Sequence, residues 1–132
     1  MKRPTKYHSC KVHSTEGTFD SRFEYERWCQ LKLLQRAGRI KDLDRQVPFE
    51  LIPAQYESYP GVSPKTGKRL TDGKRCVEKS VTYNADFVYL DLATGEKVVE
   101  DTKSSATRTK DYVIKRKLML YVHGIRIREM MR

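Results

Sequence analysis

A chain of 132 residues is long enough for one domain with its own hydrophobic core, without metal or disulfide crosslinks. Its formal net charge of +10 points to a polyanionic partner. No apolar run approaches the roughly 20 residues of a membrane span, and the basic residues are spread along the whole chain rather than gathered on one amphipathic helix. We therefore expect the partner to be nucleic acid rather than a membrane surface.

Cysteine usage favours a reducing compartment. Cys10, Cys29 and Cys76 are widely spaced and odd in number, which argues against a disulfide framework and predicts a cytoplasmic protein. His8, Cys10 and His13 lie close together, but no fourth ligand follows at the spacing of a zinc finger. We expect these side chains to be solvated or to line a strand.

The first elements predicted along the chain are two short strands and a helix. Glu16-Gly17 is typical of a turn between strands. Ser21 and Glu24 have the spacing of a capping box at a helix start, and Gly38 stands where the helix should end. Between them the apolar face consists of Phe23, Trp28, Leu31 and Leu34.

A strand is predicted next, from the alternating apolar residues of 43–52 up to Pro53. Residues 54–79 then form a long excursion, punctuated by Pro and Gly and rich in Lys and Arg. Loops of this length inside a compact domain are usually functional or disordered. We interpret the excursion as a flap or ribbon that grips a phosphate backbone; the alternative is a solvated hairpin with no such role.

The most informative stretch is 97–103, with the sequence KVVEDTK, which follows a predicted strand over 81–92 and a turn over 93–96. Strand alternation places Asp101 and Lys103 on the same face. If the loop holds two or four residues, Asp86 lies opposite Lys103, with Asp101 as its diagonal neighbour. Two carboxylates and one amine are therefore predicted to converge on one patch of sheet.

This constellation suggests metal-dependent chemistry. Two carboxylates held close repel each other and favour a divalent cation between them, and oxygen-only ligands favour Mg²⁺, for which Mn²⁺ should substitute. A nearby lysine can orient or deprotonate a water, or stabilise charge on a phosphate. The patch thus predicts phosphodiester hydrolysis. The alternative is a surface hairpin whose Asp and Lys form a weak exposed ion pair.

The chain closes with a second helix, predicted over 109–121, and a final strand, predicted over 125–128. The order is then helix, strand, hairpin, helix, strand. It predicts a single α/β domain over 1–132, with a mixed central β-sheet flanked by helices.

The order of the polar motifs resembles the PD-(D/E)XK nucleases: an acid on an opening helix, Asp-Phe in a strand, acid-x-Lys in the next strand, then a basic helix. The layout is also similar to small phage-encoded endonucleases and to Holliday-junction resolvases of the phage endonuclease I type. The resemblance covers nearly the whole chain except 54–79. The segments that carry it are Lys6-Tyr7, Phe19-Asp20-Ser21 with Glu24, Gln46-Val47-Pro48-Phe49, Ala85-Asp86-Phe87, 99–103 and 115–118.

The resemblance implies a restriction-endonuclease-like fold and a Mg²⁺-dependent endonuclease. It implies that Asp86 bridges the metal, that Asp101 is the second acid and that Lys103 handles the attacking water. Glu24 would complete the metal shell directly or through a water, although Glu24 could instead serve only as a capping-box residue. A register slip of one residue would let Glu100 replace Asp101.

The resemblance also bears on partners. Similarity to resolvases makes branched DNA the first choice of substrate, in phage DNA recombination or processing, and two symmetric cuts imply a homodimer. A nicking or terminus-processing nuclease of the transposase type, and a non-catalytic basic nucleic-acid-binding protein, stay open as alternatives. Contacts to the DNA backbone are expected from Lys68, Arg69, Lys74, Arg75, Lys110, Lys115 and Lys117.

Overall fold

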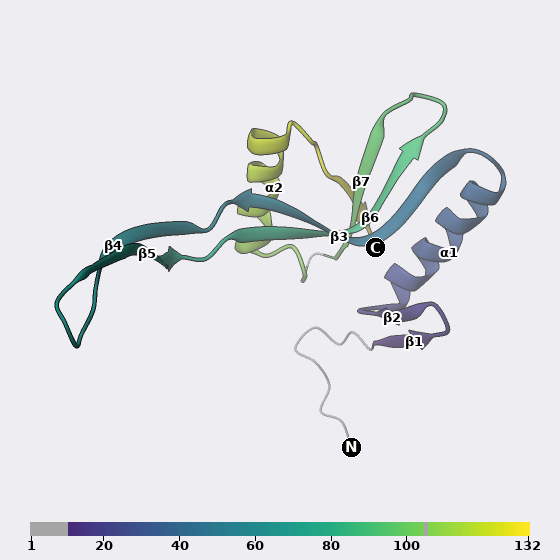
Figure 1. The fold of residues 1–132 in the computed structure, drawn as a ribbon. Coiled ribbons are helices and arrows are strands. Elements are labelled where there is room, and N and C mark those ends of the chain that lie inside the picture. Colours follow the sequence, from purple (N-terminus) through teal and green to yellow (C-terminus); the bar gives the residue numbers. More distant parts are fainter. Residues whose placement is uncertain (1–10, 105) are drawn as a thin grey trace, which may run out of the picture.

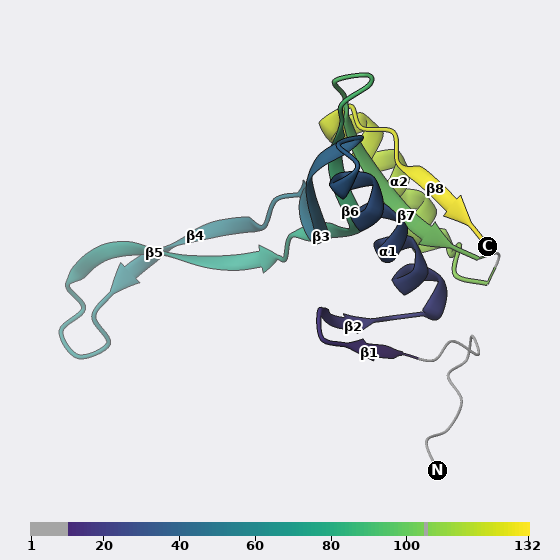
Figure 2. The same cartoon turned by 90° about the vertical axis from the view of Figure 1, so that its right-hand side faces the viewer.

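The computed structural model describes residues 11–104 and 106–132, so His8, Cys10 and the Lys6-Tyr7 segment lie outside the described residues. Two helices lie on opposite sides of a central sheet, and a long two-stranded ribbon extends away from it (Figures 1 and 2). The elements in chain order are β1 (Val12–Ser14), β2 (Gly17–Phe19), α1 (Arg22–Arg36), β3 (Ile40–Ile52), β4 (Gln55–Val62), β5 (Arg69–Glu78), β6 (Val81–Asp91), β7 (Lys97–Lys103), α2 (Lys110–His123) and β8 (Arg128–Met131).

The central sheet has four strands in the order β3-β6-β7-β8. Neighbours β3, β6 and β7 are antiparallel, whereas β8 runs parallel to β7 after the α2 crossover. The sheet is therefore mixed, and the predicted α/β class with helices on a mixed central sheet is confirmed. In the part of the chain that the structure describes, no helix is both long and apolar enough to cross a membrane.

Each helix covers its own hydrophobic cluster on one face of the sheet. Under α2 lies a cluster that includes Tyr83, Ala85 and Met119. Under α1 lies a second cluster built around Leu31 and Phe87, with Trp28, Leu34 and Leu43 packed against it. The two faces of β6 and β7 are consequently both buried, which fixes the register of these strands.

The start of α1 follows the predicted capping signal. Ser21 is the N-cap, and its hydroxyl accepts a hydrogen bond from the Glu24 amide at 3.1 Å. The helix ends at Arg36 with Ala37 as its C-cap, and Gly38 takes the left-handed conformation with φ of 74°. The turn at Glu16-Gly17 joins β1 to β2 as predicted, and it places Asp20 and Ser21 at the entrance to α1.

The final strand begins later than predicted. The sequence pattern placed it at 125–128, but β8 spans Arg128–Met131. The reason is the end of α2, where Gly124 adopts φ of 67° and the Ile125 amide donates to the Met119 carbonyl oxygen at 3.3 Å. Ile127 is buried in the cluster under α2, so 125–127 close the helix and fill the core instead of pairing.

Residues 54–79 form a regular ribbon rather than an irregular loop. β4 and β5 pair antiparallel, and they continue outward from the β3–β6 hairpin, whose last pair is Ile52 with Val81. We call residues 55–78 the β4–β5 arm. It extends well beyond the sheet and the two helices (Figure 1).

Candidate metal site

The two predicted metal-binding aspartates lie on neighbouring strands, but in a different register from the one expected. Phe87 pairs with Glu100, so Asp101 rather than Lys103 comes next opposite Asp86. The turn explains the difference. The Asp91 amide donates to the Glu96 carbonyl oxygen at 2.9 Å. The loop therefore consists of residues 92–95, one position earlier in the chain than the predicted 93–96.

The Asp86 carboxylate is tied into the neighbouring strand. Its Oδ2 accepts hydrogen bonds from the Thr102 amide at 2.8 Å and from the Thr102 hydroxyl at 2.7 Å. The β6–β7 pairs end at Phe87 and Glu100. The Asp86 carboxylate thus accepts the hydrogen bond that a backbone carbonyl would otherwise accept from the Thr102 amide. This contact keeps Asp86 beside Asp101.

The alternation of β6 breaks at Asp86. Ala85 packs in the cluster under α2, whereas Phe87, two residues later, packs in the cluster under α1. Gln46 lies at the same level of β3, between Arg45 and Val47, which pair with Phe87 and Ala85. Its φ of 52° is left-handed, which is uncommon for a residue other than glycine. Irregularities of this kind re-aim side chains and are frequent beside functional sites.

Gln46 uses this conformation to reach two acids. Its Nε2 donates to Glu24 Oε1 at 3.1 Å and lies 3.5 Å from Asp86 Oδ1. Its amide therefore links the carboxylate of α1 to that of β6. Nothing in the local sequence indicates a left-handed residue here, and only the Gln46-Val47-Pro48-Phe49 motif made Gln46 a candidate for the site.

A pair of substitutions at Gln46 is expected to expose the backbone strain. Gln46→Ala and Gln46→Gly both remove the amide, but only glycine adopts the left-handed conformation without steric cost. The glycine variant should therefore be the more stable of the two by about 1 kcal/mol in urea unfolding. At an ordinary strand position the alanine variant would be the more stable, and that order would contradict the strain.

Glu24 contributes a third carboxylate from the first turn of α1. Its Oε2 accepts from the Asp20 amide at 3.0 Å, one residue before the N-cap, while its Oε1 accepts from Gln46. The side chain is 2% exposed. Burial, followed by the charge of Asp86, raises the pKa of Glu24 to about 7. The Glu24 carboxylate thus caps the start of α1 and also lies beside Asp86, so the two roles do not exclude each other.

Asp101 is buried as well, in contact with a tyrosine and a lysine. Its Oδ2 accepts from the Tyr83 hydroxyl at 2.8 Å and lies 3.3 Å from Lys103 Nζ. Burial, followed by the hydrogen bond and charge of Asp86, raises the pKa of Asp101 to about 7. The same burial and the Asp101 charge raise the pKa of Tyr83, which keeps its hydroxyl a donor.

Lys103 is held on one side by Asp101 and on the other by an aromatic ring. Its Nζ lies 4.3 Å from the centroid of Tyr112 on α2, a cation–π distance. The Tyr112 hydroxyl donates to Glu129 of β8 at 3.1 Å, and Arg116 pairs with the same carboxylate. The predicted motif lysine is therefore oriented toward the acids by α2 and β8.

Glu100 does not compete with Asp101. It lies on the α1 face, fully buried, where Arg27 donates to both of its carboxylate oxygens at 3.1 and 2.6 Å. The Tyr89 hydroxyl also donates to Glu100, at 3.0 Å. The Glu100 oxygens are thus occupied on the opposite face of the sheet from Asp101, and it is Asp101 that lies beside Asp86.

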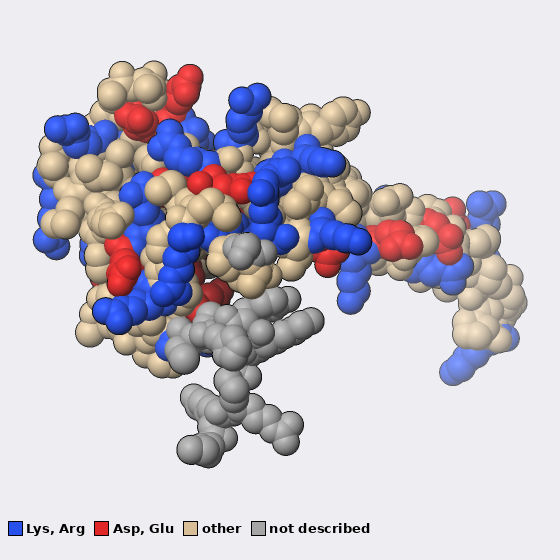
Figure 3. Space-filling view, turned by 180° about the vertical axis from the view of Figure 1, so that it is seen from behind, with Lys and Arg blue, Asp and Glu red and all other residues tan. Residues whose placement is uncertain are grey.

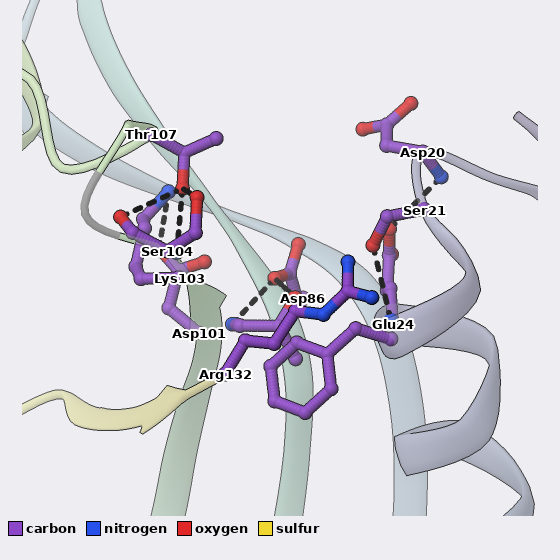
Figure 4. A pocket seen from close by; sticks show the side chains of 11 residues that line it. Asp20, Ser21, Glu24, Asp86, Asp101, Lys103, Ser104, Thr107 and Arg132 are labelled. Atoms are coloured by element: carbon purple, nitrogen blue, oxygen red, sulfur yellow. Dashed lines mark hydrogen bonds and ion pairs between the residues drawn. The ribbon is translucent and has the colours of Figure 1, made fainter. Parts of the chain in front are cut away.

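The four candidate residues line one pocket, shown in Figure 4. Glu24 enters it from α1, Asp86 from β6, and Asp101 and Lys103 from β7. A second hollow shares Asp86, Asp101 and Lys103 with it and is also lined by Gln46 and Lys115. No role was predicted for several other lining residues, namely Asp20, Thr102, Thr107 and Arg132. Ser104, which follows the motif lysine in the chain, lines the pocket as well.

The predicted DNA-binding residues fall into separate groups. Lys115 lines the second hollow beside the acids, whereas Lys117 lines a different hollow with Arg116 and Arg126. Lys110 is exposed at the start of α2. The remaining four lie on the β4–β5 arm or at its tip: Lys68, Arg69, Lys74 and Arg75.

The donor set fits a hard divalent cation. Asp86 and Asp101 supply carboxylate oxygens, and the charge of Asp86 adds to burial in raising the pKa values of Glu24 and Asp101. Mg²⁺ is commonly bound by one or two carboxylates with several waters. Over 11–104 and 106–132, no three His, Cys, Asp or Glu side chains converge closely enough to hold an ion among them. A cation here would be held directly by the carboxylates of Asp86 and Asp101, and Glu24 would reach it through a water.

Comparison with known proteins identifies a family for nearly the whole chain. No curated protein and no solved structure matches it. Residues 4–130 match the family described as "Protein of unknown function (DUF1064)". With that extent of match, the chain belongs to the DUF1064 family.

Proposed function

We propose that this protein is a metal-dependent endonuclease that hydrolyses DNA phosphodiester bonds. The observation that carries the proposal is the pocket in which Glu24, Asp86 and Asp101 lie together with Lys103. Burial makes the ionised forms of Glu24 and Asp101 costly, and a cation that shares their charge would offset this cost. The order of elements, a helix, three antiparallel strands, a helix and a parallel strand, also agrees with the resemblance to PD-(D/E)XK nucleases.

In this proposal Asp86 and Asp101 hold Mg²⁺ or Mn²⁺, with Glu24 in the outer shell. When bound, the ion polarises the scissile phosphate and lowers the pKa of a water. The Lys103 ammonium, fixed between Asp101 and Tyr112, orients the attacking water or stabilises the charge that develops on the phosphate. Gln46 and Thr102 keep the carboxylates in place through hydrogen bonds.

The proposed substrate is branched DNA, a Holliday junction or a replication fork, processed in the cytoplasm by a homodimer. The net charge of +10 supports a polyanionic substrate, and the junction preference rests on similarity to the phage resolvases. Incubating labelled junction, nicked and linear duplex DNA with the protein, with and without Mg²⁺ or Mn²⁺, tests both points. Metal-dependent cutting of the junction is expected.

The same experiment separates the alternatives. Cutting confined to nicked DNA or DNA ends would favour a terminus-processing nuclease. Salt-sensitive binding that ignores Mg²⁺ and survives EDTA, with no cleavage product, would favour a non-catalytic nucleic-acid-binding protein.

Magnesium is expected to stabilise the fold more at high pH than at low pH. The folded-state pKa values of Glu24 and Asp101 are raised to about 7 from ordinary values of 4.5 and 3.8. Between roughly pH 4 and 7 the folded state therefore binds protons that the unfolded state does not, and stability falls as the pH rises. A bound cation offsets this loss. Thermal melts should show a larger Mg²⁺-induced rise in Tm at pH 8 than at pH 5.5.

Asp101→Asn is the control for these thermal melts, since it removes one of the two acids and part of the proposed cation site. It should reduce the difference between the Mg²⁺-induced rises in Tm at pH 8 and pH 5.5. Equal shifts in Tm at pH 5.5 and pH 8 for the unsubstituted protein would contradict a cation bound by these acids.

A further inference from the structure

The β4–β5 arm has two chemically different faces. Residues opposite each other on paired strands share a face, and neighbours along a strand alternate. Glu57 lies opposite Arg75 and forms an ion pair with it, and Tyr59 lies opposite Gly73. The Arg75 guanidinium is also 5.8 Å from the Tyr59 ring. On this face the positive charge is already neutralised and stacked within the arm.

The other face carries two basic side chains that form no ion pair in the described part of the chain. Tyr56 and Ser58 lie on it opposite Cys76 and Lys74, and the alternation of β4 places Val62, opposite Arg69, on the same side, beyond the register shift between Tyr59 and Gly61. The alternation of β5 also places Asp72 on this face, two residues before Lys74, and its Oδ1 lies 3.5 Å from the Gly61 amide. Within the described residues, neither Arg69 nor Lys74 has a carboxylate within 4.0 Å. We call this the cationic face; it consists of Tyr56, Ser58, Val62, Arg69, Asp72, Lys74 and Cys76.

Large apolar side chains along the arm are also left open to solvent. Tyr56 is 63% exposed, and Val62 and Leu70 are more than half exposed. An isolated two-stranded hairpin is marginally stable in water. Several exposed apolar side chains gathered on one element are typical of a surface that contacts another molecule. Figure 3 shows Lys and Arg side chains reaching the tip of the arm.

We propose that the cationic face of the β4–β5 arm, with Lys68 at its tip, binds a groove of duplex DNA beside the segment that is cut. This deepens the proposed function and rests on it, because the arm would set how much flanking duplex a substrate needs. A two-stranded ribbon fits the major groove of B-DNA, which is about 12 Å wide. Phosphates on the groove walls would face Arg69 and Lys74, while Tyr56 and Val62 would cover sugar and base edges.

The length of the arm defines the expected contact. Strands of 8 and 10 residues, at about 3.3 Å per residue, span roughly 26–33 Å. At about 3.4 Å per base pair, this corresponds to roughly 8–10 base pairs. We therefore expect the protein to cover nearly one helical turn of duplex in addition to the DNA at the pocket.

The test measures binding rather than cleavage, so that it is independent of the nuclease activity. Fluorescence anisotropy with a 30-base-pair duplex in EDTA, over a series of NaCl concentrations, gives the affinity and its salt dependence. The combined variant Lys68→Gln, Arg69→Gln and Lys74→Gln should weaken binding at least about tenfold near 0.1 M salt. It should also reduce the slope of log K against log salt by about 2–3, since each lost phosphate contact lowers it by about 0.9.

Two controls make the result specific. The combined variant Arg36→Gln, Arg39→Gln and Lys41→Gln removes the same charge from exposed positions at the end of α1 and the start of β3, and should change the slope by less than about 1. Within the arm, Arg75→Gln should weaken binding less than Lys74→Gln does, because Arg75 already pairs with Glu57.

Three outcomes would overturn the proposal. The arm variant could bind as the unsubstituted protein does, it could lose no more affinity than the control variant, or it could change the oligomeric state, which would make the arm a contact between copies of this chain. Thermal melts of all variants verify that they are folded. DNA binding through the arm in a protein that cuts no DNA would refute the nuclease and leave the arm assignment in place.

Discussion

Asp86→Asn is expected to lower the rate of DNA cleavage at least about a thousandfold while DNA binding stays within about twofold. The carboxylate lies beside Asp101 and next to Glu24, and replacing it by an amide removes the charge that would hold the cation between strands β6 and β7. A thousandfold loss corresponds to about 4 kcal/mol of transition-state stabilisation, an ordinary value for removing one electrostatic element of a metal-assisted hydrolysis. Single-turnover cleavage of junction DNA with saturating protein measures it.

Companion variants sharpen this experiment. Asp101→Ala and Lys103→Ala should also abolish cleavage and leave binding nearly intact. The matched control is Glu26→Gln, an exposed acid on α1 that pairs with Arg22 and lies outside the pocket. It should cleave at the unsubstituted rate. Cleavage at that rate by the Asp101 and Lys103 variants would end the catalytic assignment of this pocket.

The second large effect concerns stability rather than activity. Glu100→Ala should lower the free energy of unfolding by about 3–5 kcal/mol, because it leaves the Arg27 guanidinium without its ion-pair partner between α1 and the sheet. The Arg27 side chain is only 15% exposed and donates twice to Glu100, and Tyr89 loses its acceptor as well. Urea unfolding followed by circular dichroism gives the value.

The exposed Glu26–Arg22 pair on the same helix serves as the control. Glu26→Ala should change stability by no more than about 0.5 kcal/mol, since exposed pairs contribute little. A Glu100→Ala variant as stable as Glu26→Ala would show that Arg27 finds another partner or reaches water. Replacing both Arg27 and Glu100 by apolar residues should recover most of the loss.

Local patterns predicted the elements that carry the site. The Ser21 and Glu24 spacing placed the start of α1, and strand alternation placed Asp101 and Lys103 on one face, with Glu100 on the other. These features depend on residues close together in the chain. Residues 54–79 were predicted to form either a flap or ribbon that grips a phosphate backbone or a solvated hairpin. The pairing of β4 with β5 was not predicted.

What the sequence left unresolved depends on long-range packing. The register that puts Asp101 opposite Asp86 follows from where the turn closes, at Asp91 and Glu96. The left-handed conformation of Gln46 has no signature in a glutamine residue. The Arg27–Glu100 pair joins residues 73 positions apart, which no local spacing can indicate.

The most direct measurement of the central claim is the position of a bound metal. Crystals grown with Mn²⁺, with diffraction data collected near its absorption edge, locate the ion by its anomalous scattering. We expect a peak within coordination distance of both the Asp86 and Asp101 carboxylates, and no such peak in Asp86→Asn crystals. Mn²⁺ bound elsewhere on the protein, with these two carboxylates free of metal, would contradict it.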